Sequence, residues 1–137
     1  MNLKQYHAQY VDGLKKTTLG TITKGDEICL AMKKRGFGAG KWNFSGGKKL
    51  PDETIEECHI RETAEEFRTT ITKLRLVAIL YFYFDDVPTE KNWNQKCYVF
   101  MVDEWEGEPQ ESDEMLPQWW SRESIPYHKM WAADKHW

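Results

Sequence analysis

The sequence predicts an α/β fold, in which a mixed β-sheet sandwich surrounds one central helix. Residues 17–23 are rich in β-branched side chains, and residues 27–32 return after a short turn, so the two segments form a hairpin. A stretch with helical periodicity follows at residues 54–67. Residues 74–84 and 96–102 then have the composition of two further strands.

Length and composition limit the class of protein to which this chain can belong. A chain of 137 residues indicates one domain, residues 1–137, with enough chain for a substantial core. The formal net charge is −3, so no global attraction to nucleic acid or to an anionic membrane is expected. The longest apolar run, residues 76–84, is too short to span a bilayer, and no apolar signal segment follows Met1. The three cysteines lack metal-ligand spacing and are expected to be buried thiols, which predicts a cytoplasmic protein. We expect a monomer.

The central helix carries its own start signal. Thr54 is a good N-cap, and Glu57 follows at the spacing of a capping box. Ile60, Ala64 and Phe67 recur at helical spacing, which predicts an apolar stripe facing the core.

Three carboxylates share the opposite face of this helix, because Glu62, Glu65 and Glu66 stand at positions i, i+3 and i+4. Like charges at this spacing repel, and a hard cation such as Mg²⁺ would remove the conflict because it prefers carboxylate oxygens. The alternative is a solvated acidic face. Gly46 and Gly47 before the helix favour the cation, since glycine lets the backbone approach a ligand closely.

A basic, glycine-rich segment occupies residues 33–41. It is not a dinucleotide fingerprint, because its glycines are misplaced and no strand–turn–helix context surrounds them. Either a flexible solvated loop or a loop whose cations face a polyphosphate fits this composition.

The stretch around the helix resembles the Nudix box, Gly-x5-Glu-x7-Arg-Glu-U-x-Glu-Glu-x-Gly-U, where U is bulky and apolar. The residues on its fixed positions are Gly47, Glu53, Arg61, Glu62, Glu65 and Glu66. Three positions depart from the box: Thr63 and Thr69 replace apolar residues, and Arg68 replaces the final glycine. Arg68 is therefore expected to take a positive φ at the helix end.

Within the family, the resemblance is to the MutT-like enzymes that hydrolyse oxidised purine nucleoside triphosphates such as 8-oxo-dGTP. It covers roughly residues 17–137, with an insertion around residues 85–94. The resemblance implies that Mg²⁺, or alternatively Mn²⁺, binds the carbonyl of Gly46 and the carboxylates of Glu62, Glu65, Glu66 and Glu114. It also implies a structural ion pair between Glu53 and Arg61.

The same resemblance implies a purine pocket. Its expected lining residues are Thr18, Lys33, Asn43, Phe82, Trp131 and Asp134. Relatives carry two adjacent aspartates after the tryptophan, whereas here the first is Ala133. Without a neighbouring carboxylate, Asp134 is expected to be ionised more often and to favour the donor edge of a guanine-type base. Asp134 is also placed to cap a short terminal helix.

The activity implied is Mg²⁺-dependent hydrolysis of purine nucleoside triphosphates to a monophosphate and pyrophosphate, which would sanitise the nucleotide pool. One glutamate of the helix, or Glu114, would act as general base. Two alternatives stay open. One is another Nudix substrate, such as a dinucleoside polyphosphate, a nucleotide sugar or capped RNA. The other is a non-catalytic nucleotide-binding module.

Residues 1–16 form an N-terminal extension of uncertain role. Residues 6–11 read as a strand ended by Asp12-Gly13. Relatives have a closing helix and strands that find no match here after Trp137. Either residues 6–11 supply a missing strand in a rearranged chain, or they belong to an unrelated extension.

Overall fold

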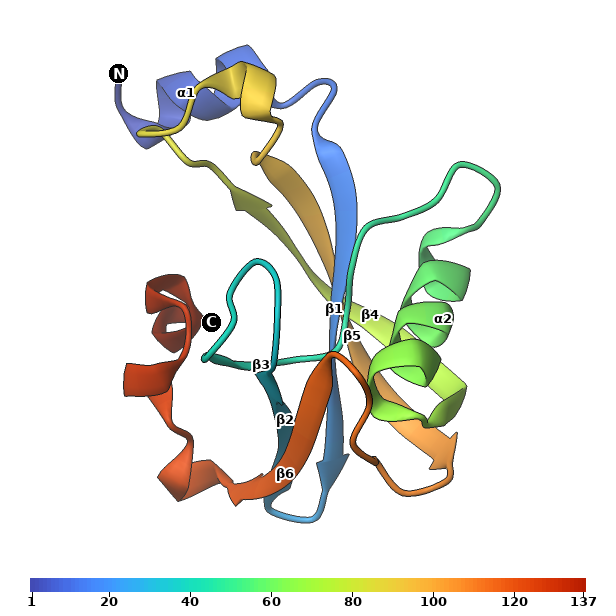
Figure 1. Ribbon diagram of the computed structural model, residues 1–137. Helices are drawn as coiled ribbons and strands as arrows, with labels where there is room; N and C mark the ends of the chain where they lie inside the picture. Colours follow the sequence, from blue (N-terminus) through green and yellow to red (C-terminus); the bar gives the residue numbers. More distant parts are fainter.

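The computed structural model describes residues 1–137 and shows a mixed sheet with one long helix against it (Figure 1). The strands are β1 (Lys15–Lys24), β2 (Glu27–Lys33), β3 (Trp42–Asn43), β4 (Thr70–Phe82), β5 (Gln95–Glu106) and β6 (Met115–Ser121). The α-helices are α1 (Leu3–Tyr10) and α2 (Ile55–Phe67). Short 3₁₀ turns span Thr89–Lys91, Arg122–Ser124, Tyr127–Lys129 and Ala132–His136. The predicted mixed α/β fold is confirmed.

β1 lies in the middle of the sheet. The strand order is β3-β2-β1-β5-β4, and β6 pairs with β2. β1 and β2 form the predicted antiparallel hairpin, with Ile22 opposite Cys29. β1 and β5 run parallel, with Thr18 opposite Tyr98, and the other strand pairs are antiparallel. Residues of β1 therefore face both α2 and the C-terminal part of the chain.

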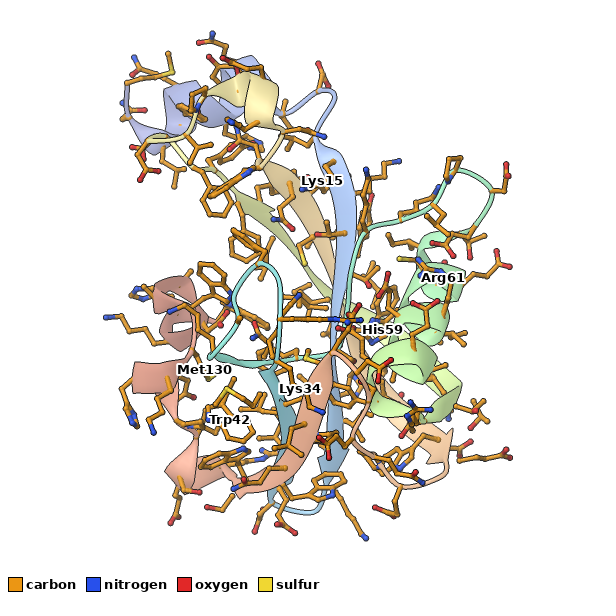
Figure 2. The ribbon with its side chains drawn as sticks, in the orientation of Figure 1. Lys15, Lys34, Trp42, His59, Arg61 and Met130 are labelled. Carbon is orange, nitrogen blue, oxygen red and sulfur yellow. The ribbon has the colours of Figure 1, made fainter.

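α2 packs against β1, β4 and β6, whereas the C-terminal turns lie on the other side of the central strands (Figure 1). The main core cluster under α2 consists of Ile22, Cys29, Ala31, Phe67, Ile71, Val102 and Met115. A second cluster of Leu30, Trp42 and Met130 lies beneath the C-terminal segment (Figure 2).

Both ends of α2 follow the local signals of the sequence. Thr54 is the N-cap, and its hydroxyl accepts a hydrogen bond from the Glu57 amide at 3.1 Å. The Glu57 carboxylate accepts in return from the Thr54 amide at 2.9 Å, which completes the capping box. At the other end Arg68 has φ 55, so the expected left-handed C-cap is present without glycine.

The buried face of α2 differs from the predicted apolar stripe. Phe67 is buried and Ile60 packs at the edge of the core, but Ala64 is exposed. The fully buried positions near the middle of the helix are Cys58, His59 and Thr63, of which His59 and Thr63 are polar. Apolar periodicity alone was misleading because this helix packs on the sheet partly through hydrogen bonds.

The predicted strand at residues 6–11 is wrong, because this segment lies in helix α1. Asn2 caps α1 in a capping box with Gln5, a signal that the aromatic composition of the segment obscured. Tyr6 and His7 pack edge-on against Tyr83 beyond the end of β4. The extension therefore folds onto the sheet as a helix, and the rearranged-strand hypothesis is excluded.

The three cysteines are free and buried, as expected. No helix is both long enough and apolar enough to cross a membrane.

Candidate active site

The site begins at the two glycines between β3 and α2. A Cβ atom at Gly46 would lie 1.9 Å from the carbonyl oxygen of Thr18, and one at Gly47 would lie 2.4 Å from the carboxyl carbon of Glu62. The backbone contact at position 46 therefore requires glycine, whereas a side chain at position 47 would displace the carboxylate of Glu62. The amide of Thr18 donates to the Gly47 carbonyl at 2.9 Å, which ties this loop to β1. The carbonyl of Gly46 accepts no hydrogen bond and stays available to a ligand.

Two carboxylates of α2 lie at the loop. Glu66 is only 4% exposed, and its Oε1 accepts a hydrogen bond from the Gly46 amide at 2.9 Å. Burial, with a smaller contribution from the charges of Glu62 and Glu114, raises the pKa of Glu66 to about 8. Burial also raises the pKa of Glu62, although Arg61 opposes this shift. The negative charges of these carboxylates therefore repel one another in a partly desolvated space.

This donor set fits a divalent cation. As the side chains stand, no three of the His, Cys, Asp and Glu residues form a closed metal cluster. However, a free backbone carbonyl lies beside two carboxylates whose pKa values are raised by burial, and a hard cation would offset that cost. Glu65 is exposed and Glu114 half-exposed, so both lie further out.

An ion pair between Glu53 and Arg61 is present. Arg61 donates from Nε and one terminal nitrogen to the two oxygens of Glu53, at 2.9 and 2.8 Å. This pairing lowers the pKa of Glu53 to about 2. Arg61 also donates to Glu62 at 2.9 Å and to the carbonyl of Lys48 at 3.2 Å. On the outer side of α2, Arg61 therefore holds the box loop to the helix (Figure 2).

A cavity of about 650 Å³ opens next to this loop. All six residues expected to line a purine pocket line it: Thr18, Lys33, Asn43, Phe82, Trp131 and Asp134. Gly46 and Glu66 of the implied metal set also line it, whereas Glu62, Glu65 and Glu114 do not. One continuous space therefore joins an aromatic wall to the buried carboxylate.

The polar groups of the pocket have defined orientations. The Asn43 side chain donates to the carbonyl of Lys41 at 2.8 Å, which leaves its oxygen free. Phe37 stacks on Trp131 with ring centroids 4.9 Å apart, and the Lys41 ammonium lies 5.2 Å from the Trp131 ring centroid. The basic loop thus packs against the pocket and is not only a solvated loop.

Asp134 lies inside the 3₁₀ turn Ala132–His136 and does not cap it, because Trp131 precedes the turn. One oxygen of Asp134 accepts a hydrogen bond from the indole nitrogen of Trp137 at 3.1 Å. Burial nevertheless raises the pKa of Asp134. We expected Asp134 to ionise readily because position 133 carries no carboxylate. Burial favours the protonated form, as a neighbouring carboxylate would, and this weakens the expectation. Ala133 also lines the cavity.

The sequence did not indicate several of the residues that line the cavity. The additional aromatic and cationic lining residues are Lys15, Phe37, Phe44, Lys48, Tyr83 and Phe84. Phe37 could have been found from its place in the glycine-rich loop. Lys15 and Lys48 are distant in sequence and carry no local signal. Burial and the charge of Lys48 lower the pKa of Lys15, so the two cations lie close to each other.

A buried polar network connects the pocket to α2, and it too was missed. His59 lies between α2 and the sheet (Figure 2), where its Nδ1 is 3.2 Å from the hydroxyl of Thr18. Thr63, one of the departures from the box, donates to the hydroxyl of Ser45 at 3.0 Å. His59 stacks on Phe100, with ring centroids 5.4 Å apart. The packing under the helix is thus polar at the position where the box has an apolar residue.

Comparison with known proteins agrees with this geometry. The chain is 44% identical over 123 residues to an oxidized purine nucleoside triphosphate hydrolase of Danio rerio, covering 90% of this chain and 76% of that protein. It is 38% identical over 120 residues to the protein of the same name from Mus musculus, covering 88% and 74%. A solved MutT Nudix hydrolase from Burkholderia pseudomallei shares the fold, with a TM-score of 0.76 at 20% identity over 90% of this chain and 95% of that one. The profile of the Nudix domain matches residues 14–137, which include the loop, the carboxylate helix and the cavity, and the chain therefore belongs to the Nudix family.

Proposed function

We propose that this protein hydrolyses purine nucleoside triphosphates, including oxidised ones such as 8-oxo-dGTP, to the monophosphate and pyrophosphate, with Mg²⁺ as cofactor. The observation that carries the proposal is the single cavity that joins the aromatic wall at Trp131 to Gly46 and Glu66. The names of the Danio rerio and Mus musculus relatives support the substrate class. Such an activity would remove oxidised purines from the nucleotide pool.

The two ends of the cavity would bind different parts of the nucleotide, the base at one end and the phosphates at the other. Trp131 and Phe82 offer ring faces for a purine, and stacking on an aromatic side chain is worth about 1–3 kcal/mol. Asn43 offers its free side-chain oxygen to the edge of the base. Lys33 lies at the Glu66 end, where its charge acts on that carboxylate and suits phosphate oxygens.

The carboxylates and the Gly46 carbonyl would hold the cation. Bound Mg²⁺ supplies charge neutralisation for phosphate oxygens and acidifies a water molecule. Because Glu62 and Glu66 are the less exposed carboxylates, we expect them to be the inner ligands. Glu65 and Glu114 are more exposed, and either could bind the ion from further out or accept a proton from water. Comparing the pH–rate profiles of the single Glu→Gln variants assigns the general base.

A screen for pyrophosphate release across nucleotides tests the proposal. With Mg²⁺, the wild-type protein should turn over 8-oxo-dGTP or dGTP, and chelation by EDTA should abolish turnover. A lack of turnover on any purine triphosphate would instead favour another Nudix substrate or a binding module.

The preference between guanine-type and adenine-type bases gives a more specific test, because Ala133 stands where relatives have the first of two adjacent aspartates. An ionised Asp134 only accepts hydrogen bonds and suits the N1–H and amino donors of a guanine-type edge, whereas a protonated one can also donate. Since burial raises the pKa of Asp134, the ratio of kcat/KM for 8-oxo-dGTP over 2-oxo-dATP should rise with pH. Ala133→Asp should broaden the substrate range. A ratio independent of pH, or a preference for the adenine analogue, would contradict this role.

We also propose that the protein acts as a monomer in the cytosol. The cavity is complete within one chain, and the cysteines are free and buried, as suits a reducing compartment. Light scattering and localisation of a tagged protein test the two statements.

A further inference from the structure

A second, smaller cavity of about 310 Å³ adjoins the cavity of about 650 Å³, which we call the purine cavity because we propose that it holds the base. The two share the lining residues Lys15, Phe37, Phe84 and Gln95. Two residues of the inserted loop, Lys91 and Trp93, line only the smaller cavity. We call this cavity, lined by these six residues, the annex.

The inserted loop has a defined shape that places Trp93 at the annex. The Phe84 amide donates to the side chain of Asn94 at 2.8 Å, which joins the two ends of the loop. Inside it, the amides of Lys91 and Asn92 donate to the carbonyls of residues 88 and 89 at 3.0 Å, forming the turn Thr89–Lys91. Asn92 takes a left-handed conformation with φ 56, which turns the chain toward Trp93. The annex wall is therefore held by main-chain and side-chain hydrogen bonds.

The annex offers partly exposed aromatic rings. Trp93 packs edge-on against Phe37 and Phe84, with centroid distances of 5.0 and 5.6 Å. Trp93 remains 38% exposed and Phe37 53% exposed. Because Phe37 stacks on Trp131, the aromatic surface is continuous from the purine cavity into the annex. A second planar group could pack on this surface without leaving the nucleotide site.

The annex is also cationic. Lys15 and Lys91 take part in none of the ion pairs of the protein. Lys15 is half-buried and close to Lys48, and its lowered pKa reflects both burial and that repulsion. An anion bound here would relieve the repulsion.

Lys91 is the annex cation that lies apart from the implied metal site, because it lines the annex and not the larger cavity that includes Gly46 and Glu66, whereas Lys15 lines both. Gly46 and Glu66 lie near residues 18–20 of β1, because Gly46 contacts Thr18 and Ser45 pairs with Gly20. Lys15 is at the start of the same strand, three residues before Thr18, and three steps along a strand span roughly 10 Å at about 3.3 Å per residue. A nucleotide whose 5′-phosphates reach Glu66 therefore needs a different anionic group to reach Lys91.

We propose that the annex binds a second phosphate, carried on the 3′ side of the sugar of a purine nucleoside 5′-triphosphate. With the base on Trp131 and the 5′-phosphates at Glu66, the 3′ side of the sugar is the part of the nucleotide left to carry a further phosphate into the annex. Such a group occurs in a free 3′-phosphorylated nucleotide and at the 5′ end of an oligonucleotide. Trp93 would contact the second base only in the latter. This inference rests on the proposed placement of the nucleotide.

The test compares dGTP, its 3′-phosphate and the 5′-triphosphorylated dinucleotide dG-dT, by calorimetry in EDTA so that no turnover is required. The 3′-phosphate should bind the wild-type protein about tenfold more tightly than dGTP. Lys91→Met should remove most of this gain and leave dGTP binding unchanged, whereas the matched control Lys24→Met, at the exposed end of β1, should keep it. Trp93→Ala should weaken only the dinucleotide if the oligonucleotide end is the source.

Two results would overturn the inference: equal affinities for dGTP and its 3′-phosphate in the wild type, or a gain that survives in Lys91→Met. Failure of the proposed function is separate, because it would appear as an absence of pyrophosphate release from dGTP and 8-oxo-dGTP with Mg²⁺.

Discussion

Replacing Glu66 by glutamine tests the cost of keeping a carboxyl group buried beside the box loop. Burial raises the pKa of Glu66 from 4.5 to about 8. Between these values the folded protein holds a proton that the unfolded chain has released. The contribution of Glu66 to the free energy of unfolding should therefore be highest below pH 4.5 and fall as pH rises toward 8. At 1.36 kcal/mol per pKa unit, the full loss is about 5 kcal/mol.

Glu66→Gln removes the titration and keeps the oxygen that accepts from the Gly46 amide at 2.9 Å. In EDTA, urea unfolding should show variant and wild type to be similar near pH 5 and the variant more stable by several kcal/mol near pH 8.5. Mg²⁺ should stabilise the wild type at pH 8.5 but have little effect on the variant. Turnover should fall by several orders of magnitude, because an amide lacks the charge that the cation needs.

Glu56→Gln is a suitable control, because Glu56 is exposed in the first turn of the same helix. It should leave both the pH dependence of stability and the turnover unchanged. The reasoning fails if the difference in unfolding free energy between wild type and Glu66→Gln does not grow from pH 5 to 8.5, or if Glu66→Gln keeps a near-normal rate.

Three further predictions concern the pocket and the network behind it. Burial lowers the pKa of His59 from 6.5 to about 4, so the unfolded chain binds the extra proton in this window. Stability should fall by about 3 kcal/mol as pH drops from 6.5 to 4, and thermal melts of His59→Phe should lack this component of acid sensitivity. Trp131→Ala should raise KM for the nucleotide about 5- to 150-fold, as expected for loss of about 1–3 kcal/mol of stacking, with little change in Tm; a large Tm loss at constant KM would indicate core packing instead. Gly20→Ala should destabilise the fold strongly in urea unfolding, because its Cβ would lie 1.8 Å from Nε2 of His59, and His59→Ala should rescue it; an equally unstable double variant would refute the steric explanation.

Local signals predicted the elements that depend on local hydrogen bonds. The capping box at Thr54 marked the start of α2, and the chain after Phe67 turns through a left-handed Arg68, as the box spacing required. The β1–β2 hairpin followed from its β-branched strands and short turn. Each of these depends on residues within a few positions of one another, which a sequence displays directly.

Elements that depend on distant partners were predicted less well. Tyr6 and Tyr10 suggested a strand, but their rings pack on each other in a helix, and Tyr6 also contacts Tyr83. In the same way, the family resemblance named the pocket residues but not Lys15 or Lys48, whose place in the cavity wall depends on how separate segments meet. Burial, and with it the pKa of Asp134, is likewise a property of the folded chain.

The departure at Thr63 shows how the box tolerates a polar residue under its helix. Thr63 follows Glu62, and Ser45 precedes Gly46, so the 3.0 Å hydrogen bond between their hydroxyls joins the neighbours of two implied ligands. His59 extends this link to Thr18 on the pocket wall at 3.2 Å. The ring of His59 occupies the space beside Gly20 on β1. The absence of a side chain at Gly20 therefore makes room for the large ring of His59 between α2 and the sheet. An apolar residue at position 63 would pack the same interface but could not hydrogen-bond to Ser45. The polar network therefore replaces dispersion contacts with directional ones between the helix, the glycine loop and the wall of the larger cavity.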